Sequence, residues 1–146
     1  MQFPFIRCYH PNFPVPPHSF FVLSKGENAG RPATTPWVNS FMIICPHEGY
    51  HDFYFWLCYG LYNAGSFKVR QRGSVIPFIN INDVRDIFRE VAPRIHQDWQ
   101  RYKEILSVLE RLDQHKATLA EQILATKDLQ RVLLQKYLGS NTKKGQ

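Results

Sequence analysis

The chain has 146 residues, of which 44% are hydrophobic and 14% aromatic, and its formal net charge at pH 7 is +6. This composition excludes general disorder, and the length predicts one globular domain with a modest core. The charge permits contact with DNA or another polyanion, although basic solvated surfaces are common. No apolar run is long enough to span a bilayer, and five early prolines interrupt any signal-peptide core, so we expect a soluble, cytoplasmic protein with no membrane contact.

The cysteines indicate a reducing compartment. Cys8, Cys45 and Cys58 are an odd number, and no two of them form a CxxC pair. A disulfide framework or a cysteine-rich zinc site is therefore not expected.

The first part of the chain alternates strand-like and loop-like segments. Residues 1–18 are rich in proline and predict an extended surface segment that is no central strand of a sheet. Residues 19–24 (SFFVLS) and 37–45 (WVNSFMIIC) predict strands, and residues 25–36 between them predict a polar loop. Residues 51–63 are apolar nearly throughout, which predicts a buried helix, with a strand as the alternative.

Residues 66–72 (SFKVRQR) alternate apolar with basic side chains, as a half-exposed strand does. Lys68, Arg70 and Arg72 would then lie on one face, where three cations could follow a phosphate backbone. An equally good interpretation is an edge strand whose charges deter aggregation. Together with two cations of the loop predicted at residues 25–36, they form the candidate DNA-binding set: Lys25, Arg31, Lys68, Arg70 and Arg72.

A second strand and a short helix are expected next. Residues 75–81 (VIPFINI) favour β-structure, but Pro77 restricts them to an irregular or edge strand. Asn82 is then expected to cap a short helix, with Asp83 and Asp86 near its positive end.

One long helix is predicted over residues 94–138, because the segment contains no glycine or proline and is bounded by Pro93 and Gly139. Its apolar residues recur at alternating steps of four and three, which is the heptad pattern of a coiled coil. We expect dimerisation, or binding of a partner helix, through this stripe. It consists of Ile105, Leu109, Leu112, Leu119, Ile123, Leu133 and Tyr137, with Lys116, Thr126 and Gln130 as polar exceptions.

His47, Glu48 and His51 match the HExxH signature of zinc peptidases, in which two histidines one helical turn apart bind the metal. Pro46 and Gly49 oppose the helix that this signature needs. We therefore interpret the segment as a strand-to-helix turn and expect no metal site. The sequence also has no nucleotide-binding motif and no recognisable nucleophile arrangement, so we expect neither a cofactor nor catalysis.

Residues 73–87 (GSVIPFININDVRDI), followed by a helix with Pro93 and Gln97 near its start, resemble the end of a target-recognition domain in DNA-specificity subunits of type I restriction-modification systems. In that family a Gly-Ser turn, a short strand with proline and a capped helix lead into a long helix. The upstream order is also similar, with KGENAG at 25–30, a strand containing Asn39 and Phe41, and an aromatic helix near 54–62.

This resemblance implies a globular part that reads duplex DNA, a long helix that acts as spacer and dimerisation arm, and a methyltransferase subunit as partner. The chain carries one copy of the arrangement where such subunits have two. A compact relative from an uncharacterised family on mobile elements is an equally consistent reading.

We therefore expect an α+β fold with a compact recognition-like domain over residues 1–92, a long coiled-coil-type helix over residues 93–138, and a disordered tail over residues 139–146. The expected function is a non-catalytic DNA-recognition module that forms a homodimer through its helix. The alternative is a protein-interaction or scaffolding module without DNA binding.

Overall fold

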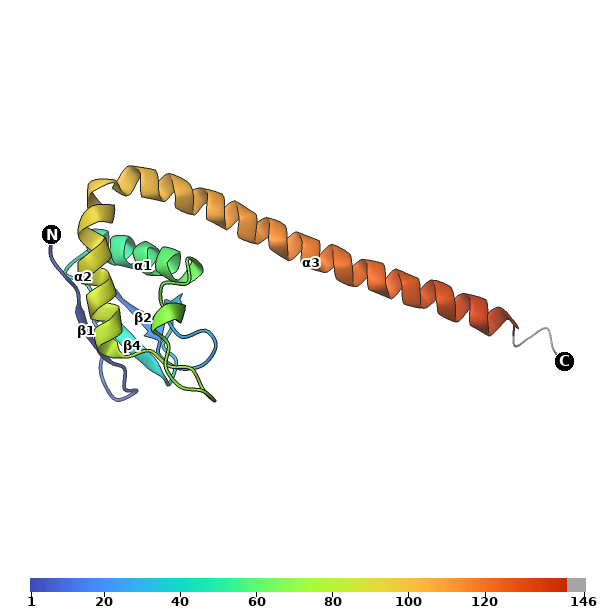
Figure 1. Ribbon diagram of the computed structural model, residues 1–146, viewed down its shortest axis with the longest axis horizontal. Helices are drawn as coiled ribbons and strands as arrows, with labels where there is room; N and C mark the ends of the chain where they lie inside the picture. The colour runs from blue at the N-terminus through green and yellow to red at the C-terminus, as the bar shows by residue number, and fades with distance from the viewer. Residues whose placement is uncertain (142–146) are drawn as a thin grey trace. The chain divides into compact units, whose positions relative to one another are not determined.

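The fold is α+β, as predicted, with a small antiparallel sheet, two shorter helices and one long helix (Figure 1). The computed structural model describes the backbone of residues 1–141 and the side chains of residues 1–139. Contacts divide the chain into two units, Met1–Tyr102 and a second unit that starts at Lys103. Within residues 1–141, no helix combines the length and the hydropathy needed to cross a membrane.

The sheet has four strands in the order β1-β4-β2-β3, and each neighbouring pair is antiparallel. The predicted strands at 19–24 and 37–45 are confirmed, although the second one starts only at Ser40. The proline-rich segment contributes an unexpected strand, which lies at the edge of the sheet, where missing amide donors are tolerated. The strands are β1 (Phe5–Cys8), β2 (Ser19–Leu23), β3 (Pro32–Ala33) and β4 (Ser40–Ile44).

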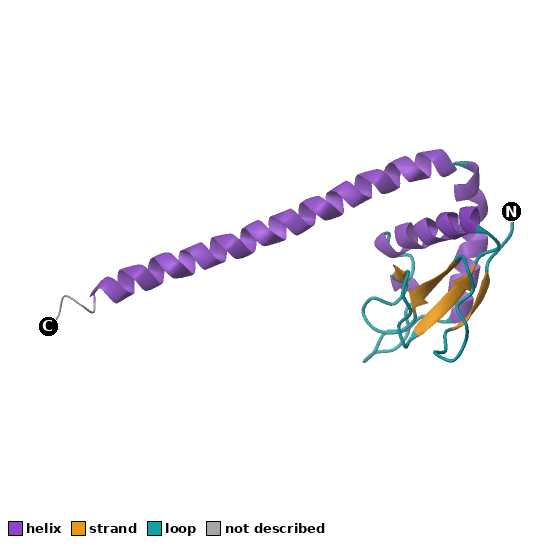
Figure 2. Cartoon of the chain, turned by 180° about the vertical axis from the view of Figure 1, so that it is seen from behind, coloured by secondary structure: helices purple, strands orange, loops and turns teal. Residues whose placement is uncertain are grey.

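The core lies between one face of this sheet and the helices α1 (Glu48–Asn63) and α2 (Ile81–Gln97) (Figure 2). Strand register places Ile6, Ile43 and Phe20 in one row on that face, all nearly inaccessible to solvent. The prediction of a helix at 51–63 is confirmed, and the strand alternative is wrong.

The strand predicted at residues 66–72 is wrong. The chain leaves α1 through Gly65, whose φ is +76°, and forms the 3₁₀ helix η1 (Lys68–Arg70). Phe67 is the anchor of this turn, since it is 1% exposed and packs against Gly30, where an added Cβ would come within 2.6 Å of its ring. One buried aromatic residue thus fixes a turn where the alternating pattern indicated a strand.

The strand predicted at residues 75–81 is also wrong. Only Phe78 pairs there, through isolated bridges to Arg72 and to Lys25. The segment then enters α2 at Ile81.

The long helix begins later than predicted. Pro93 lies inside α2, which continues to Gln97, and α3 (Trp99–Asn141) starts after Asp98 leaves helical geometry. Trp99 packs edge-on against Phe53, with ring centroids 5.0 Å apart. This contact lies within the compact unit and holds the first residue of α3 against α1.

The predicted C-terminal end of the long helix also differs from the structure. The helix continues through Gly139 to Asn141. Of the tail predicted to be disordered, residues 142–146 lie outside the described residues.

Candidate functional site

Hydrogen bonds join the loops that carry the candidate DNA-binding cations. The Gly26 N–H donates to the Pro77 carbonyl at 2.7 Å, and the Gln71 side chain donates to the Ala29 carbonyl at 3.4 Å. The loop after β2 therefore lies against the segment between α1 and α2. This brings the candidate cations onto adjoining loops, although not onto one face of a strand.

The cations differ in their partners. Lys25, Arg31 and Lys68 are exposed, and none of the ion pairs among residues 1–139 involves them. Arg70 donates to the Glu90 carboxylate on α2 at 3.2 Å. Three of the five cations are therefore open to an external anion, whereas Arg70 already has a carboxylate partner.

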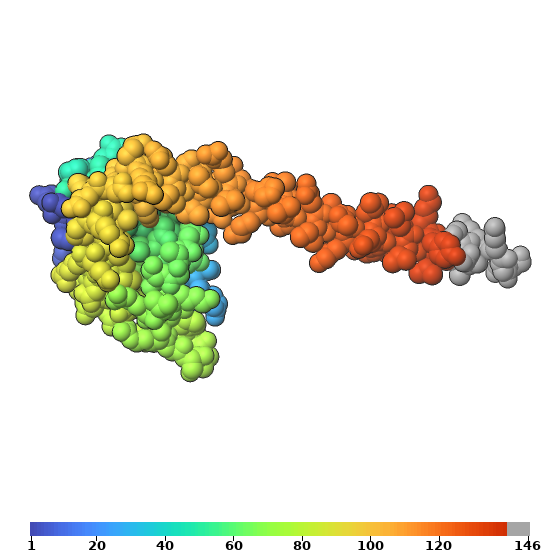
Figure 3. Space-filling view, turned by 45° about the horizontal axis from the view of Figure 1, so that its top comes forward, coloured from blue at the N-terminus to red at the C-terminus, as the bar shows by residue number. Residues whose placement is uncertain are grey.

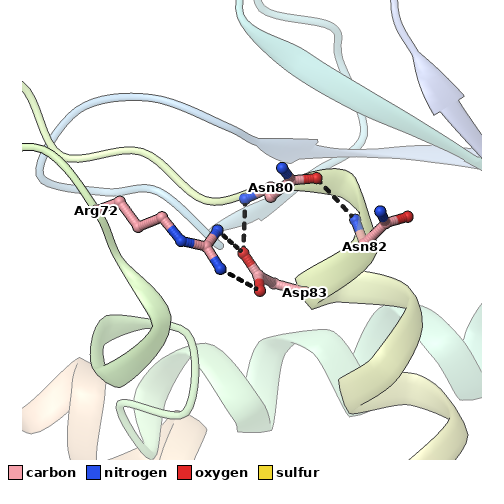
Figure 4. Close-up of polar contacts among 4 residues, drawn as sticks. All are labelled: Arg72, Asn80, Asn82 and Asp83. Carbon is pink, nitrogen blue, oxygen red and sulfur yellow. Dashed lines mark hydrogen bonds and ion pairs between the residues drawn. The ribbon is translucent and has the colours of Figure 1, made fainter.

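Arg72 is held by the N-terminus of α2 (Figure 4). Its guanidinium donates twice to the Asp83 carboxylate, at 2.7 and 3.2 Å, and Asp83 also accepts the backbone N–H of Asn80 at 2.9 Å. The Asn80 side chain accepts the Asn82 N–H at 3.1 Å and completes a capping box. Asn80 is thus the N-cap, and the prediction that Asn82 caps this helix is wrong.

The electrostatics of Asp83 fit a structural ion pair. Desolvation would raise the pKa of this buried carboxyl. Hydrogen bonds from Arg72 and from the Asn80 backbone, with the charges of Arg72 and Arg70, outweigh that effect and lower the pKa below its ordinary value. Asp83 is therefore ionised at neutral pH, and Arg72 serves mainly to neutralise it.

His47 lies at the turn between β4 and α1, as predicted, but α1 begins at Glu48 and contains His51 and Gly49, so the expectation that Gly49 opposes a helix is wrong. His47 is extended (φ −160°, ψ 171°) and precedes α1, so no helix runs through it. The His51 ring lies 3.2 Å from the Asp52 carboxylate and stacks on Phe55. Among the described residues, no group of three or more potential metal ligands is present.

The second candidate site is the predicted apolar stripe of α3. We call its ten heptad positions the seam. In the isolated chain, six of the seven apolar seam side chains are between 43% and 67% exposed, and Leu109 is half-buried. The seam consists of Ile105, Leu109, Leu112, Lys116, Leu119, Ile123, Thr126, Gln130, Leu133 and Tyr137.

Sequence reasoning missed an apolar loop tip in the compact unit. Val75 and Ile76 are 89% and 62% exposed. They belong to the segment between η1 and α2, which is light green in Figure 3 and lies along the lower edge of that view. Nearby, a groove of about 400 Å³ is lined by residues that include Tyr9, Val38 and Phe78. Because apolar residues around Pro77 fit a strand equally well, only the Gly-Ser turn before them signalled a loop.

Comparisons with known proteins place most of the chain in one family. Residues 6–136 match a family of unknown function (DUF6943), and the match includes nearly all of the sheet, α1, α2 and most of α3. No curated protein and no solved structure gives a match.

Proposed function

We propose that this chain, which belongs to the DUF6943 family of unknown function, is a non-catalytic assembly module that pairs with a second copy of itself through the seam of α3. The observation that carries this proposal is the exposure of the apolar seam in the single chain. Soluble monomers rarely expose apolar patches beyond a few hundred Å², and larger patches mark interaction sites.

The area of the seam is sufficient for a stable pair. If its seven apolar side chains together lose on the order of 600 Å² of exposed surface, two copies bury roughly 1,200 Å², at the lower end of the range of specific interfaces. Flanking side chains on the same side, including Val108, Leu129 and Leu134, are at least half exposed and would add to this area. The seam therefore supports association without any contribution from the compact unit.

Two neighbouring residues of α3 offer a matched test. Ile123 lies in the seam and is 58% exposed, whereas Leu124 lies outside it and is 62% exposed. Ile123→Asp would bury an unpaired carboxylate in the interface, which costs several kcal/mol, whereas Leu124→Asp leaves the charge in water. By multi-angle light scattering, we expect a dimer for the wild type and for Leu124→Asp, and a monomer for Ile123→Asp.

Far-UV circular dichroism of both variants shows whether the helices remain formed. A wild-type chain that is monomeric at high concentration would exclude the proposal. Equal effects of the two substitutions would also exclude it, because they would show that the seam is not the interface.

DNA recognition is the second candidate. The observation that favours it is that Lys25, Arg31 and Lys68 are all exposed. They lie on the loop after β2 and on η1, within two segments that hydrogen bonds join, in a chain with net charge +6. The resemblance to DNA-specificity subunits points the same way, and a methyltransferase subunit would then be the partner. The ion pairs of Arg70 and Arg72 count against a larger basic surface.

A further inference from the structure

We infer that the two copies of α3 pair antiparallel, with the centre of the pair beside Glu121. This inference rests on the proposed self-association and specifies its geometry. It follows from the order of polar and charged residues along the seam and at the heptad positions directly next to it.

Direction decides which seam residues meet. In a parallel, in-register pair each seam residue lies beside its own copy. In an antiparallel pair centred at Glu121, the seam matches itself in reverse, and Leu119 lies beside Ile123 of the second copy. All ten positions then find a seam partner, whereas a shift by one heptad leaves two positions of each copy without one. The further pairs are Lys116 with Thr126, Leu112 with Gln130, Leu109 with Leu133, and Ile105 with Tyr137.

Lys116 favours the antiparallel arrangement. Parallel pairing would bring two Lys116 ammonium groups together in a partly dehydrated interface, where like charges repel. Antiparallel pairing places each Lys116 beside Thr126 of the second copy. The Thr126 hydroxyl already donates to the Gln122 carbonyl at 2.8 Å, so its oxygen is available to accept from the ammonium.

The border of the seam carries complementary charges. Asp113 and Lys127 each follow a seam residue and stand at the same heptad position, two heptads apart. In an antiparallel pair, equivalent heptad positions next to the seam come together. Each Asp113 then lies near Lys127 of the second copy. Ala120, midway between them, lies near Ala120 of the second copy. In a parallel pair these charges face Val108 and Gln122 instead.

Other interactions along the helix are compatible with this arrangement. Asp113 also contacts Lys116 of its own helix at 3.2 Å, but such exposed pairs contribute little and do not prevent a second contact. Gln130 is the one seam residue that favours parallel pairing, because two neighbouring amides could exchange hydrogen bonds. One neutral hydrogen-bonded pair is outweighed by relief of the Lys116 repulsion, to which the two Asp113–Lys127 pairs add a smaller contribution.

Distances between spin labels distinguish the two directions. Glu121 and Gln135 lie on the helix face opposite the seam, two heptads apart. In an antiparallel pair, the two Gln135 residues are separated by about 42 Å along the axis, since a helix rises about 1.5 Å per residue. The two Glu121 residues are separated only by the width of the pair, roughly 20 Å.

The experiment uses the full chain with Cys8→Ser, because Cys8 is the exposed cysteine and Cys45 and Cys58 are buried. Double electron–electron resonance is measured on Glu121→Cys and Gln135→Cys, each spin-labelled. We expect a distance of roughly 20 Å for Glu121→Cys and more than 40 Å for Gln135→Cys. Distances near 20 Å for both would show a parallel pair and overturn the inference while leaving self-association intact. The absence of any intermolecular distance would overturn the proposed function itself.

Charge reversal tests the contact between Asp113 and Lys127. Asp113→Lys places like charges at both ends of the antiparallel pair and should weaken dimerisation roughly tenfold. Adding Lys127→Asp restores opposite charges and should recover most of the affinity, measured by analytical ultracentrifugation. A parallel pair would show no recovery, because the two positions do not meet in it.

Discussion

Asp83 connects the turn before α2 with the start of that helix. Its carboxylate accepts from Arg72 and from the Asn80 backbone, so a single buried side chain fixes both segments. An ionised group of this kind stabilises the fold only while its partners remain. Arg72, which the sequence pattern placed among the candidate DNA-binding cations, therefore has a structural role.

At the residue scale, we predict that Asp83→Asn lowers the free energy of unfolding at pH 7 by about 1–3 kcal/mol, since the amide cannot neutralise Arg72. Because the pKa of Asp83 is lowered in the folded protein, its contribution is present above the unfolded pKa, near 4, and is lost as pH falls through the folded pKa. Urea denaturation from pH 7 down to pH 2.5 measures the difference. The difference in free energy of unfolding between the wild type and Asp83→Asn should shrink at the acidic end of this range.

Asp86→Asn is the matched control on the same helix. Its side chain is 59% exposed and its carboxylate lies 3.7 Å from the Arg89 guanidinium, so we expect a change below about 0.5 kcal/mol. Equal losses for the two variants, or a loss for Asp83→Asn that does not depend on pH, would contradict the structural role of Asp83.

At the element scale, Gly60 in α1 leaves room for Tyr102 at the start of α3. An added Cβ there would meet the Tyr102 hydroxyl and come within 2.9 Å of its ring. That hydroxyl donates to the Trp56 carbonyl at 3.2 Å, and burial raises the pKa of Tyr102 to about 12, so it remains a donor. The close approach of the two helices thus requires a residue without a side chain.

We predict that Gly60→Ala destabilises the protein by about 1–2 kcal/mol, although the same change ordinarily stabilises a helix. The reason is that Tyr102 must move and lose its hydrogen bond. Thermal unfolding measures the change, and Tyr102→Phe in the same background should restore part of it. Gly49→Ala, elsewhere in α1, should be neutral or stabilising, because its Cβ would meet only the His47 ring at 3.3 Å or more. A stabilised Gly60→Ala protein would contradict this packing.

How far the sequence predicts these elements depends on where their stabilising contacts lie. The strands β2 and β4 and the helix α1 are mostly apolar, so local composition indicates three buried elements, although it left a strand open as the alternative for α1. The turn at η1 depends on Phe67 packing against Gly30, far away in the sequence. At Asp98, the contact between Trp99 and Phe53 holds the start of α3, and the only local signal is an aspartate at the position before the helix.

The candidate sites differ in the same way. The seam repeats at helical spacing along one element, so its residues can be listed from the sequence, whereas its role in pairing stays a prediction. The roles of Arg70 and Arg72 depend on carboxylates supplied by α2, and a count of charges cannot separate structural cations from available ones. Lys68 alone of the three predicted strand cations remains open to an external anion.

At the scale of the whole molecule, self-association and DNA recognition can be tested independently. The seam lies in the unit that starts at Lys103, and the exposed loop cations lie in the compact unit. A variant that loses one property need not lose the other. Substitutions in each unit therefore separate a pure assembly module from one that also binds nucleic acid.

The last prediction concerns duplex DNA. If Lys25, Arg31 and Lys68 each contact a phosphate, a log–log plot of affinity against salt should have a slope of about −2.7 for each bound compact unit, since each contact contributes about −0.9. Fluorescence anisotropy between 50 and 200 mM salt measures this slope. Changing all three residues to alanine should flatten it nearly to zero, whereas Arg111→Ala with Arg131→Ala on α3 should leave it nearly unchanged. No binding of duplex DNA at low salt, or equal sensitivity to both sets of substitutions, would exclude DNA recognition and leave the assembly module as the remaining function.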